Sequence, residues 1–554
     1  MRGYRHLRET NELGKIATIK DALARTHFDR CASNSSRIVF GAGLDHAETV
    51  VRQFLSVRFA YLSLNEALLY AIGKPDSALV HPLPAEWRAV LVHHGLRVAE
   101  IRCTLAWAGY VAVHLANGAF ATASAVFHSA IELVRPSWPK LGTFTFFHGL
   151  TRANIPREAA VADGRDIITW YLQWPGRPDR LDSLCHTVSG VAPFRIGSTE
   201  VCSIPSPIQP LSEFRSLIRY IGWGVAATGL SIIDFLRGRW WHGLLLKEAS
   251  SAAVIRSQSG VSLARDYLFH NGVWVFRPLW TYEAEKLGSR ICYYFYSTNC
   301  ETFKRPHGYP LQENVWNVMN WPFYMVWDEY QRDFIQRAVG NTASIRIVGP
   351  IWFQDGTNEI PPLPPASVAV FDVEPHRPSR YQILGTAQEY FVPETATQFL
   401  LDLHEAIRQS GGTMVLKRKR PIGRLRNRRY ARVIEQLRQS GHFTGIDPET
   451  SALRVIESCA AVVSMPFTST ALLGRHLGKP SAYYDPTGLV QKDDRAAHGI
   501  EILSGRDELE AWLIAAIFAP GSQSASAGCE DRSDLNGADG PCARQALDTT
   551  VASE

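Results

Sequence analysis

The fold of this chain is decided by the stretch Val462-Val463-Ser464-Met465-Pro466-Phe467-Thr468-Ser469-Thr470-Ala471-Leu472-Leu473-Gly474. A short apolar strand over residues 460–463 runs into small hydroxyl residues, and a helix is expected to begin near Ser469 or Thr470. Such a strand-to-helix turn presents free backbone N–H groups and the positive end of the helix dipole, which together favour phosphate. The hydroxyls of Thr468, Ser469 and Thr470 either cap this helix or bind an oxyanion.

A basic cluster lies upstream of this turn. A strand over residues 414–416 ends in Lys417-Arg418-Lys419-Arg420, and further arginines follow as far as residue 432 with no acid between them. Ligands of open α/β sheets bind at the carboxyl ends of the strands. Lys417, Lys419 and Arg420 are therefore predicted to bind a donor phosphate together with the Thr468–Thr470 turn. The alternatives are a solvated basic face or a patch for nucleic acid or lipid.

Several short motifs carry a resemblance to a known family. They are Phe371-Asp372-Val373-Glu374-Pro375, Leu416 to Arg420, Ile446-Asp447-Pro448, Pro466 to Ala471, Gly478 to Ser481 and, upstream, Arg277 to Trp280, Tyr294 to Asn299 and Val348 to Pro350. Over roughly residues 265–515 the chain resembles the bacterial polysaccharide-biosynthesis proteins named for their PFTS motif. More distantly it is similar to the donor-binding half of GT-B glycosyltransferases of the capsule and sialic-acid type. Those often carry Lys-x-His-Pro where this chain has Lys417 to Pro421, so the histidine is absent here.

The resemblance implies an α/β fold of the GT-B kind, with two Rossmann-like domains that face a cleft. It implies a glycosyltransferase that moves a sugar from a nucleotide-sugar donor, of CMP or UDP type, to a lipid-linked or growing glycan acceptor of a bacterial surface polysaccharide. GT-B enzymes generally work without a metal or other cofactor, because protein cations and a helix dipole stabilise the departing phosphate. The basic cluster and the Thr468–Thr470 turn are suited to that role.

Other candidate residues follow the ends of apolar stretches. Glu374 and His376 are candidates for the general base that deprotonates the acceptor hydroxyl, and a loop with a salt bridge is the alternative. Asp485 is expected either to bind a donor ribose hydroxyl or to cap a turn. His270 and Asn271 are candidates for the acceptor side, and a simple turn is the alternative there.

The pattern along the chain predicts five regions. These are a flexible N-terminus over residues 1–36, an acceptor-side α/β domain over 37–360, a Pro-rich linker over 361–367, a nucleotide-sugar-binding domain over 368–518 and a disordered tail over 519–554. Short strands are predicted at Asp166 to Tyr171 and at residues 368–371, and helices are predicted at 428–438, 452–457 and 506–518. The linker contains Pro361-Pro362-Leu363-Pro364-Pro365, and the tail is rich in Gly, Ser, Ala and Asp.

Composition excludes some classes of protein. The 554 residues are 46% hydrophobic and 20% charged, which is typical of a globular chain. The net charge of +5 is modest, so the basic cluster is a local feature. Nine cysteines without a C-x-x-C pair are typical of reduced thiols, and Cys103, Cys292 and Cys459 are expected in the core. The first 20 residues are charged and lack the apolar segment of a secretory signal.

One segment, residues 217–246, is expected to contact a membrane. Its longest uncharged run, 220–233, is shorter than a spanning helix requires, so an in-plane helix with an edge of arginines and Trp240-Trp241 is favoured. A buried core helix is the alternative. The expected location is cytoplasmic and peripheral on the inner face of the inner membrane.

Two further functions are compatible with the sequence. One is transfer of a phosphate-linked alditol on the same fold. The other is a non-enzymatic protein that binds nucleic acid or lipid through the basic cluster. A nucleic-acid reader spreads aromatic and cationic side chains over one surface, whereas the aromatic clusters here, 293–296 and 316–327, lie far along the chain from the cations, so no nucleic-acid partner is expected.

Overall fold

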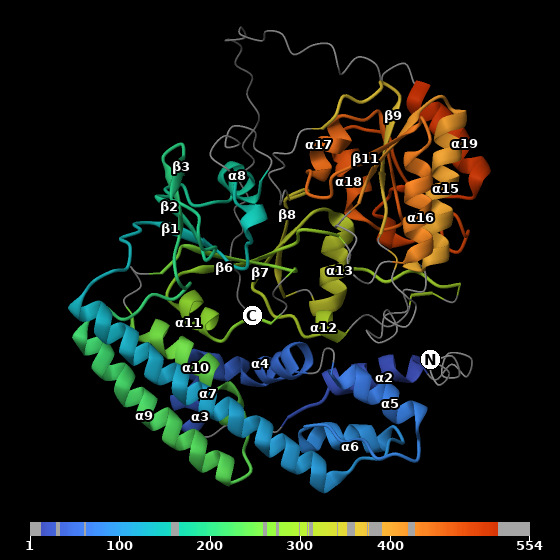
Figure 1. The fold of residues 1–554 in the computed structure, drawn as a ribbon. Helices are drawn as coiled ribbons and strands as arrows, with labels where there is room; N and C mark the ends of the chain where they lie inside the picture. The colour runs from blue at the N-terminus through green and yellow to red at the C-terminus, as the bar shows by residue number, and fades with distance from the viewer. Residues whose placement is uncertain are drawn as a thin grey trace, which may run out of the picture.

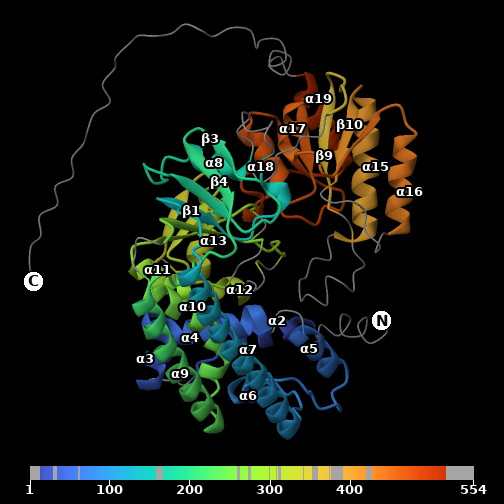
Figure 2. The same cartoon turned by 60° about the vertical axis from the view of Figure 1, so that its left-hand side comes forward.

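The computed structural model describes residues 13–28, 34–59, 63–156, 166–258, 263–272, 276–298, 300–306, 308–309, 314–340, 342–351, 360–373, 375, 391–418 and 427–518. Two β-sheets, built almost entirely of parallel strands, stand beside each other, and a layer of helices from the first part of the chain lies beneath the first sheet (Figure 1). Figure 2 shows the same arrangement after a turn of 60°. The predicted α/β fold with two Rossmann-like domains is confirmed.

The first sheet has the order β3-β4-β2-β1-β5-β6-β7-β8. All neighbouring strands are parallel except β3, which pairs antiparallel with β4 at one edge. From β1 the chain builds outward to β4 and then returns to place β5 on the other side of β1, so the order reverses between β1 and β5. The strands are β1 (Phe144–Phe147), β2 (Ser183–His186), β3 (Phe194–Ile196), β4 (Thr199–Ser203), β5 (Asp266–His270), β6 (Arg290–Tyr294), β7 (Phe323–Val326) and β8 (Ser344–Ile347).

Helices dominate the first 140 residues and cover the first sheet. They and the helices between the strands are α2 (Leu13–Ala24), α3 (Asn34–Phe40), η1 (Gly41–His46), α4 (Ala47–Gln53), η2 (Phe54–Phe59), α5 (Ser63–Gly73), α6 (Ala85–His93), α7 (Glu100–Val134), η3 (Arg152–Asn154), α8 (Ile167–Gln173), α9 (Phe214–Leu236), α10 (Trp241–Ser257), α11 (Trp280–Lys286), α12 (Asn314–Asn317) and α13 (Glu329–Val339).

The expectation of a flexible N-terminus does not hold for its described part. Residues 13–24 form α2, and Ile16, Ile19 and Leu23 on this helix are at most 2% exposed within the main hydrophobic core. Apolar residues at positions i, i+3 and i+7 supply the face that this burial requires. Residues 1–12 and 29–33 of this region lie outside the described residues.

The strand predicted at 166–171 is also wrong, because this segment forms the helix α8. The Asp166 carboxylate accepts hydrogen bonds from the backbone N–H groups of Ile168 and Thr169, both at 2.9 Å. Asp166 is therefore the N-cap residue of α8. The five residues after the cap are all buried, and a short apolar run of this kind does not distinguish a strand from a buried helix.

The segment expected to contact a membrane consists of two helices, α9 and α10. The tryptophan part of the predicted edge is wrong, because Trp241 is 5% exposed and begins the buried helix α10, whereas Arg219, Arg237 and Arg239 are exposed as expected. Trp240 is half-buried, with its ring 5.7 Å from that of Phe28 and 5.2 Å from that of Trp107. The outer side of α9 remains exposed.

The second sheet is parallel throughout, with the order β11-β10-β9-β12-β13-β14. Residues of β9 are buried on both faces, as expected of a central parallel strand. The strands are β9 (Ser367–Phe371), β10 (Thr413–Lys417), β11 (Phe443–Ile446), β12 (Ala461–Ser464), β13 (Ser481–Asp485) and β14 (Glu501–Ser504). The helices are α15 (Pro393–Gln409), α16 (Arg428–Arg438), α17 (Ala452–Glu457), α18 (Ser469–His476), η7 (Arg495–Ala497) and α19 (Arg506–Phe518).

The chain passes from one sheet to the other between Ile347, where β8 ends, and Ser367, where β9 begins. The predicted Pro-rich linker lies in this interval, and Ile360 and Leu363 pack against a core cluster of the second domain. The predicted disordered tail, 519–554, lies outside the described residues. The cysteines expected in the core, Cys103, Cys292 and Cys459, are at most 2% exposed and have free thiols.

Candidate functional site

The strand order of the second domain fixes where a ligand can bind. The chain runs outward from β9 through β10 to β11, and then returns to place β12 on the other side of β9. In doubly wound sheets the crevice at such a reversal, outside the carboxyl ends of the strands, is the binding site. The turn after β12 and the basic end of β10 therefore flank the same strand, β9, at the same edge of the sheet.

The turn after β12 has an unusual backbone. Phe467 has a φ of 66°, in the left-handed region that residues with a Cβ rarely adopt. Its side chain is 7% exposed. The centre of its ring lies 4.6 Å from that of Phe303 and 5.7 Å from that of Tyr483, and both pairs are packed edge to face. Buried aromatic contacts of this kind hold the strained turn in place. The turn reverses the chain so that α18 begins at the carboxyl edge of the sheet.

The three hydroxyl residues of the turn have different partners. Within the described part of the chain, Thr468 makes no side-chain capping bond to α18, and its hydroxyl instead donates to the Met465 carbonyl at 2.9 Å. The Thr470 and Ser464 hydroxyls lie 2.8 Å apart. The first turn of α18 thus keeps backbone N–H groups that the Thr468 side chain does not occupy, together with the positive end of the helix dipole.

The side chain of Ser469 contacts the first domain. Its hydroxyl oxygen accepts a hydrogen bond from the Thr298 backbone N–H at 3.1 Å and lies 3.3 Å from the Thr298 hydroxyl. Thr298 follows β6 of the first sheet, so the carboxyl-end loops of β6 and β12 meet directly. The side chain that the sequence assigned to donor phosphate therefore contacts the other domain.

Two cations stand at the end of β10. Lys417 is the last residue of the strand and is only 6% exposed. Arg418 follows it, and its buried Nη1 atom has no hydrogen-bond partner among the described residues. Lys419, Arg420, Glu374 and His376 lie outside the described residues, so their assignments stay predictions. Arg418 belongs to the predicted basic cluster but is not among the residues predicted to bind the donor phosphate.

Asp485 ends β13 and caps a turn. Its Oδ1 accepts from the Thr487 backbone at 2.9 Å and from the Thr487 hydroxyl at 2.6 Å, and its Oδ2 accepts from the Val490 backbone at 2.8 Å. The side chain is fully buried. Of the two roles considered from the sequence, the structure favours the turn cap. Asp372, which sequence reasoning did not select, lies at the end of β9, is 4% exposed and accepts a hydrogen bond from the Tyr430 hydroxyl.

The acceptor-side candidates lie at the carboxyl end of β5, where His270 ends the strand and Asn271 follows it, at the reversal point of the first sheet. His270 is 5% exposed, its Nε2 lies 3.2 Å from the Gly149 carbonyl, and its Nδ1 accepts from the Gly272 backbone at 3.1 Å. Asn271 accepts from the Tyr296 backbone at 3.1 Å. Both side chains thus shape the loops at this edge.

Two other histidines follow neighbouring strands of the first sheet and escaped the sequence analysis. His148 follows β1, and burial lowers its pKa to about 3, with further contributions from His270 and Arg58. His186 ends β2, and burial lowers its pKa to about 4 with a contribution from Arg152. Within the described residues, the buried Nε2 of His186 has no hydrogen-bond partner. A histidine following each of three adjacent strands is a signal that only the strand order makes visible.

Charged and aromatic contacts hold the two domains together beside this site. Arg495 donates to both carboxylate oxygens of Glu301, at 2.9 and 3.1 Å, and lies 3.7 Å from the centre of the Tyr309 ring. His498 has its Nδ1 2.7 Å from an oxygen of Asp328. Among the described residues, only Phe467 and His498 are non-glycine residues with a left-handed backbone, and both contact the first domain.

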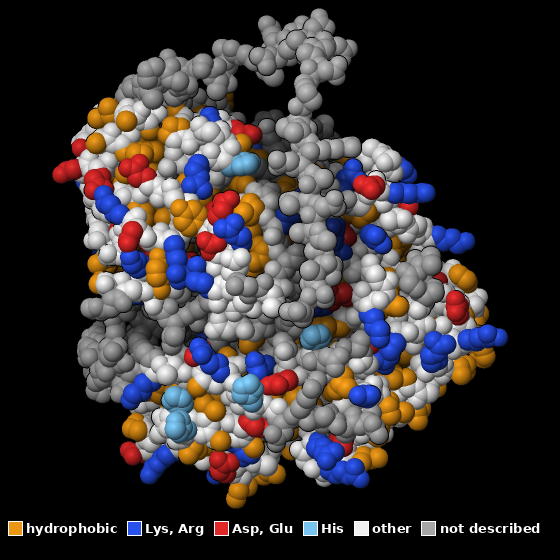
Figure 3. Space-filling view, turned by 180° about the vertical axis from the view of Figure 1, so that it is seen from behind, with side chains coloured by type: hydrophobic (Ala, Val, Ile, Leu, Met, Phe, Trp, Pro, Cys, Tyr) orange, Lys and Arg blue, Asp and Glu red, His pale blue; other side chains and the backbone are white. Residues whose placement is uncertain are grey.

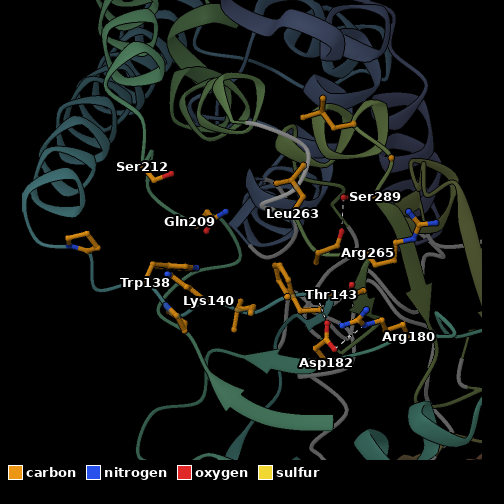
Figure 4. A pocket seen from close by; sticks show the side chains of 18 of the residues that line it. Trp138, Lys140, Thr143, Arg180, Asp182, Gln209, Ser212, Leu263, Arg265 and Ser289 are labelled. Carbon is orange, nitrogen blue, oxygen red and sulfur yellow. Dashed lines mark hydrogen bonds and ion pairs between the residues drawn. The ribbon is translucent and has the colours of Figure 1, made fainter. Parts of the chain in front are cut away.

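Two cavities lie away from this edge. The one shown in Figure 4 has a volume of about 830 Å³ and opens at the amino ends of β1, β2, β5 and β6, next to Thr143, Asp182, Arg265 and Ser289. The other, of about 890 Å³, runs between α7 and α10. Neither includes the Phe467 turn. The described residues contain no group of three or more His, Cys, Asp or Glu side chains that could hold a metal ion.

A family model described as "Polysaccharide biosynthesis PFTS motif protein" matches residues 227–513. The chain belongs to this family. The matched region starts in α9, includes β5 to β8 of the first sheet and contains the whole of the second sheet with the Phe467 turn. The recognition made from the sequence is thereby confirmed. No curated protein matches this PFTS motif protein.

Several solved structures show a distant likeness. The lipopolysaccharide outer core galactosyltransferase WaaB is 9% identical with a TM-score of 0.32, and the likeness covers 68% of this chain and 90% of that one. Anabaena Alr3699/HepE in complex with UDP and glucose is 10% identical with a TM-score of 0.31, over 69% and 91%. UDP-GlcNAc 2-epimerase from Methanocaldococcus jannaschii is 10% identical with a TM-score of 0.30, over 68% and 91%. Scores this low carry no argument about the PFTS motif protein.

Proposed function

We propose that this PFTS motif protein is a glycosyltransferase that moves a sugar from a nucleotide-sugar donor to an acceptor in the biosynthesis of a bacterial surface polysaccharide. The observation that carries the proposal is the arrangement at the reversal point of the second sheet. There the N-terminus of α18 and the cations Lys417 and Arg418 stand on either side of β9. Membership of a polysaccharide-biosynthesis family supports a polysaccharide as the proposed product.

The chemistry follows from the charges at this edge. When a glycosyl bond to a nucleotide breaks, negative charge develops on the departing phosphate. Preorganised N–H groups and cations in a site with little water stabilise that charge more than bulk water does. The first-turn N–H groups of α18 and the ammonium of Lys417 supply such partners, and Lys419 and Arg420 are proposed to extend the set. In this reading the reaction needs no metal.

The first domain is proposed to hold the acceptor. Its carboxyl-edge loops meet the Phe467 turn through the Thr298–Ser469 contact, so an acceptor bound at this edge lies next to the donor phosphate. Glu374 and His376 remain the proposed candidates for the general base, because the acceptor hydroxyl must lose its proton as the new bond forms. The Asp485 side chain has no part in donor binding in this proposal, because it is occupied by its turn.

Nucleotide binding tests the proposal directly. Calorimetric titration of the full chain with UDP, GDP, CDP and CMP should identify one preferred nucleotide. A hydrogen bond to a charged group is worth about 1.5–3 kcal/mol, so Lys417→Met should weaken that binding at least about tenfold. The matched control is Lys479→Met, because Lys479 precedes β13 at the opposite, amino edge of the same sheet.

Two outcomes would overturn the assignment. One is that no nucleotide of the panel binds the wild-type chain. The other is that Lys417→Met and Lys479→Met bind the preferred nucleotide equally well. A preference for CDP would favour an alditol donor over a sugar donor, and in that case the proposed reaction, though not the proposed site, would be wrong.

A further inference from the structure

Helices α7 and α9 present one continuous apolar surface, here called the α7–α9 face. More than half of the exposed large hydrophobic side chains of the described residues lie on these two helices. They are Ile101, Leu105, Val113, Phe120, Phe127, Ile131 and Val134 on α7, and Phe214, Ile218, Val225, Ile232, Ile233 and Leu236 on α9. Isolated apolar side chains on a surface are ordinary, whereas a contiguous patch of this kind marks an interaction site.

The spacing of these side chains places them on one side of each helix. From Leu105 onward the large residues of α7 recur at intervals of seven or eight and then of four and three. Those of α9, apart from Ile233, recur at intervals of four and seven, as one helical face requires. Residues 103–131 of α7 and 220–233 of α9 contain no Lys, Arg, Asp or Glu. The face is therefore apolar along most of its length.

The two helices lie side by side and cover α10. The Leu211 backbone just before α9 donates to the Ser129 hydroxyl of α7 at 3.0 Å, and Gly224 of α9 lies against Thr122, where a Cβ would come within 2.7 Å of the threonine methyl carbon. Helix α10 is buried along almost its whole length beneath them. Figures 1 and 2 both show α7 and α9 running together at the outer edge of the helical layer.

Among the described residues, α7 and α9 are the two helices long and apolar enough to cross a membrane by length and composition. Their packing argues against crossing. A spanning helix with lipid around it needs an apolar surface on all sides, but the inner sides of α7 and α9 carry the buried polar residues Thr122, Glu132, Ser231 and Asp234. One apolar side and one side packed on protein is the pattern of a helix that lies in the plane of the interface.

Arginines surround the face. Arg215, Arg219, Arg237 and Arg239 are exposed at the two ends of α9, and Arg102 and Arg135 are exposed at the two ends of α7. Among the acids at these ends, Glu100 pairs with Arg88, Glu213 is exposed, and the buried Asp234 lies 3.6 Å from Arg239. In the view from behind, orange and blue side chains occur together at the lower right edge, where α7 ends and α9 begins (Figure 3).

The charge decides between the candidate occupants. If two copies of this chain paired through this face, the arginines at the helix ends of one copy would lie against those of the other. Like charges brought together in this way oppose binding. Anionic lipid headgroups complement the arginines, and the acyl region accepts the apolar side chains. The cavity of Figure 4 adds Lys140 and Arg265 next to the end of α7, where Pro136 and Ser212 also line it, whereas its Arg180 pairs with Asp182 at 3.5 Å.

We propose that the α7–α9 face docks this protein onto the surface of an anionic lipid bilayer, with both helices in the plane of the membrane. The proposal differs from the expectation based on residues 217–246 in its residues. Helix α7 supplies half of the surface, and the Trp240-Trp241 pair takes no part, because Trp241 is core and Trp240 is half-buried. It does not depend on the identity of the transferred group.

Sedimentation with vesicles tests the docking. The full chain is mixed at low salt with vesicles of phosphatidylglycerol and phosphatidylcholine in equal parts, or of phosphatidylcholine alone. The test variants are Phe120→Ser with Phe127→Ser, and Val225→Ser with Leu236→Ser, because these side chains are at least 62% exposed and their loss leaves the core intact. The matched control is Leu489→Ser with Ile514→Ser, two exposed apolar residues of the second domain.

We expect the wild type and the control to sediment with the anionic vesicles and to be released by high salt. Each test variant should lose at least about tenfold in its partition coefficient, since burying one large apolar side chain is worth that much. Arg215→Gln with Arg219→Gln should weaken binding to the anionic vesicles and reduce its salt dependence.

The proposal is wrong if the wild type does not sediment with anionic vesicles, or if the test variants bind like the control. It is equally wrong if light scattering shows a dimer that the test variants dissociate while vesicle binding is absent. Nucleotide affinity is measured on the same samples, so that failure of the docking and failure of the donor site are seen separately.

Discussion

The left-handed backbone of Phe467 should make glycine more stabilising than alanine at this position, which is the reverse of the usual order. At an ordinary position alanine is more stabilising than glycine, because glycine loses more conformational freedom on folding. At a φ of 66° the Cβ of alanine meets the backbone unfavourably, and glycine does not. We therefore expect Phe467→Gly to give a more stable protein than Phe467→Ala.

The magnitudes separate into a shared loss and a difference. Both variants lose a ring that is 7% exposed and that contacts Phe303 and Tyr483, which should cost about 3–5 kcal/mol. The left-handed conformation costs a residue with a Cβ about 1–2 kcal/mol, and this is only partly offset by the smaller conformational entropy that alanine loses on folding, about 0.4–1 kcal/mol. The difference in favour of glycine should be of order 1 kcal/mol or slightly less.

Urea unfolding of the full chain, followed by the transition of the second domain, measures this difference. The control pair is Gln398→Ala and Gln398→Gly, at an exposed position inside α15, where alanine should be the more stable by about 1 kcal/mol. Nucleotide titration of the same proteins shows whether the turn keeps its shape. If Phe467→Ala proves as stable as Phe467→Gly or more so, while the Gln398 pair behaves as expected, the reasoning about the turn is refuted.

Two further predictions concern the interface and pH. Arg495→Ala removes two hydrogen bonds to the largely buried Glu301 of the other domain, so we expect the two domains to be coupled less tightly. Solution scattering should then give a larger radius of gyration than for the wild type. An unchanged radius would contradict this prediction. His186 has a pKa near 4 in the folded chain, which is below its value of about 6.5 in the unfolded chain. Between these two pH values the unfolded chain binds a proton that the folded chain does not. The contribution of His186 to the free energy of unfolding is therefore complete above about pH 6.5 and falls towards pH 4 by at most about 1.4 kcal/mol per pH unit. His148, with a pKa near 3, adds to the same trend. His186→Gln should flatten the dependence of the unfolding midpoint on pH, and an equally steep dependence would show that this histidine is not the group concerned.

Local pattern was sufficient for much of the second domain. The helices 428–438, 452–457 and 506–518 have the bounds that their apolar spacing predicted, and strands were placed correctly at 368–371, 414–416 and near 460–463. These segments combine a clear period with Gly, Pro or Asn at their ends, so local and tertiary preferences agree. The segment 166–171 lacks such a period, and the side chain of Asp166 decided for a helix.

Residues that are neighbours along the chain were enough to predict the turn at 464–470, the cations at the end of β10 and the family. Which residues these groups contact could not be predicted in this way, because it depends on the packing of the whole fold. Ser469 lies 171 positions from Thr298, and no periodic pattern encodes a contact over that separation. The same holds for the burial of Trp241 and for the pairing of α7 with α9 into one face. Strand order and helix packing bring such residues together through space, and they are set by the whole core at once.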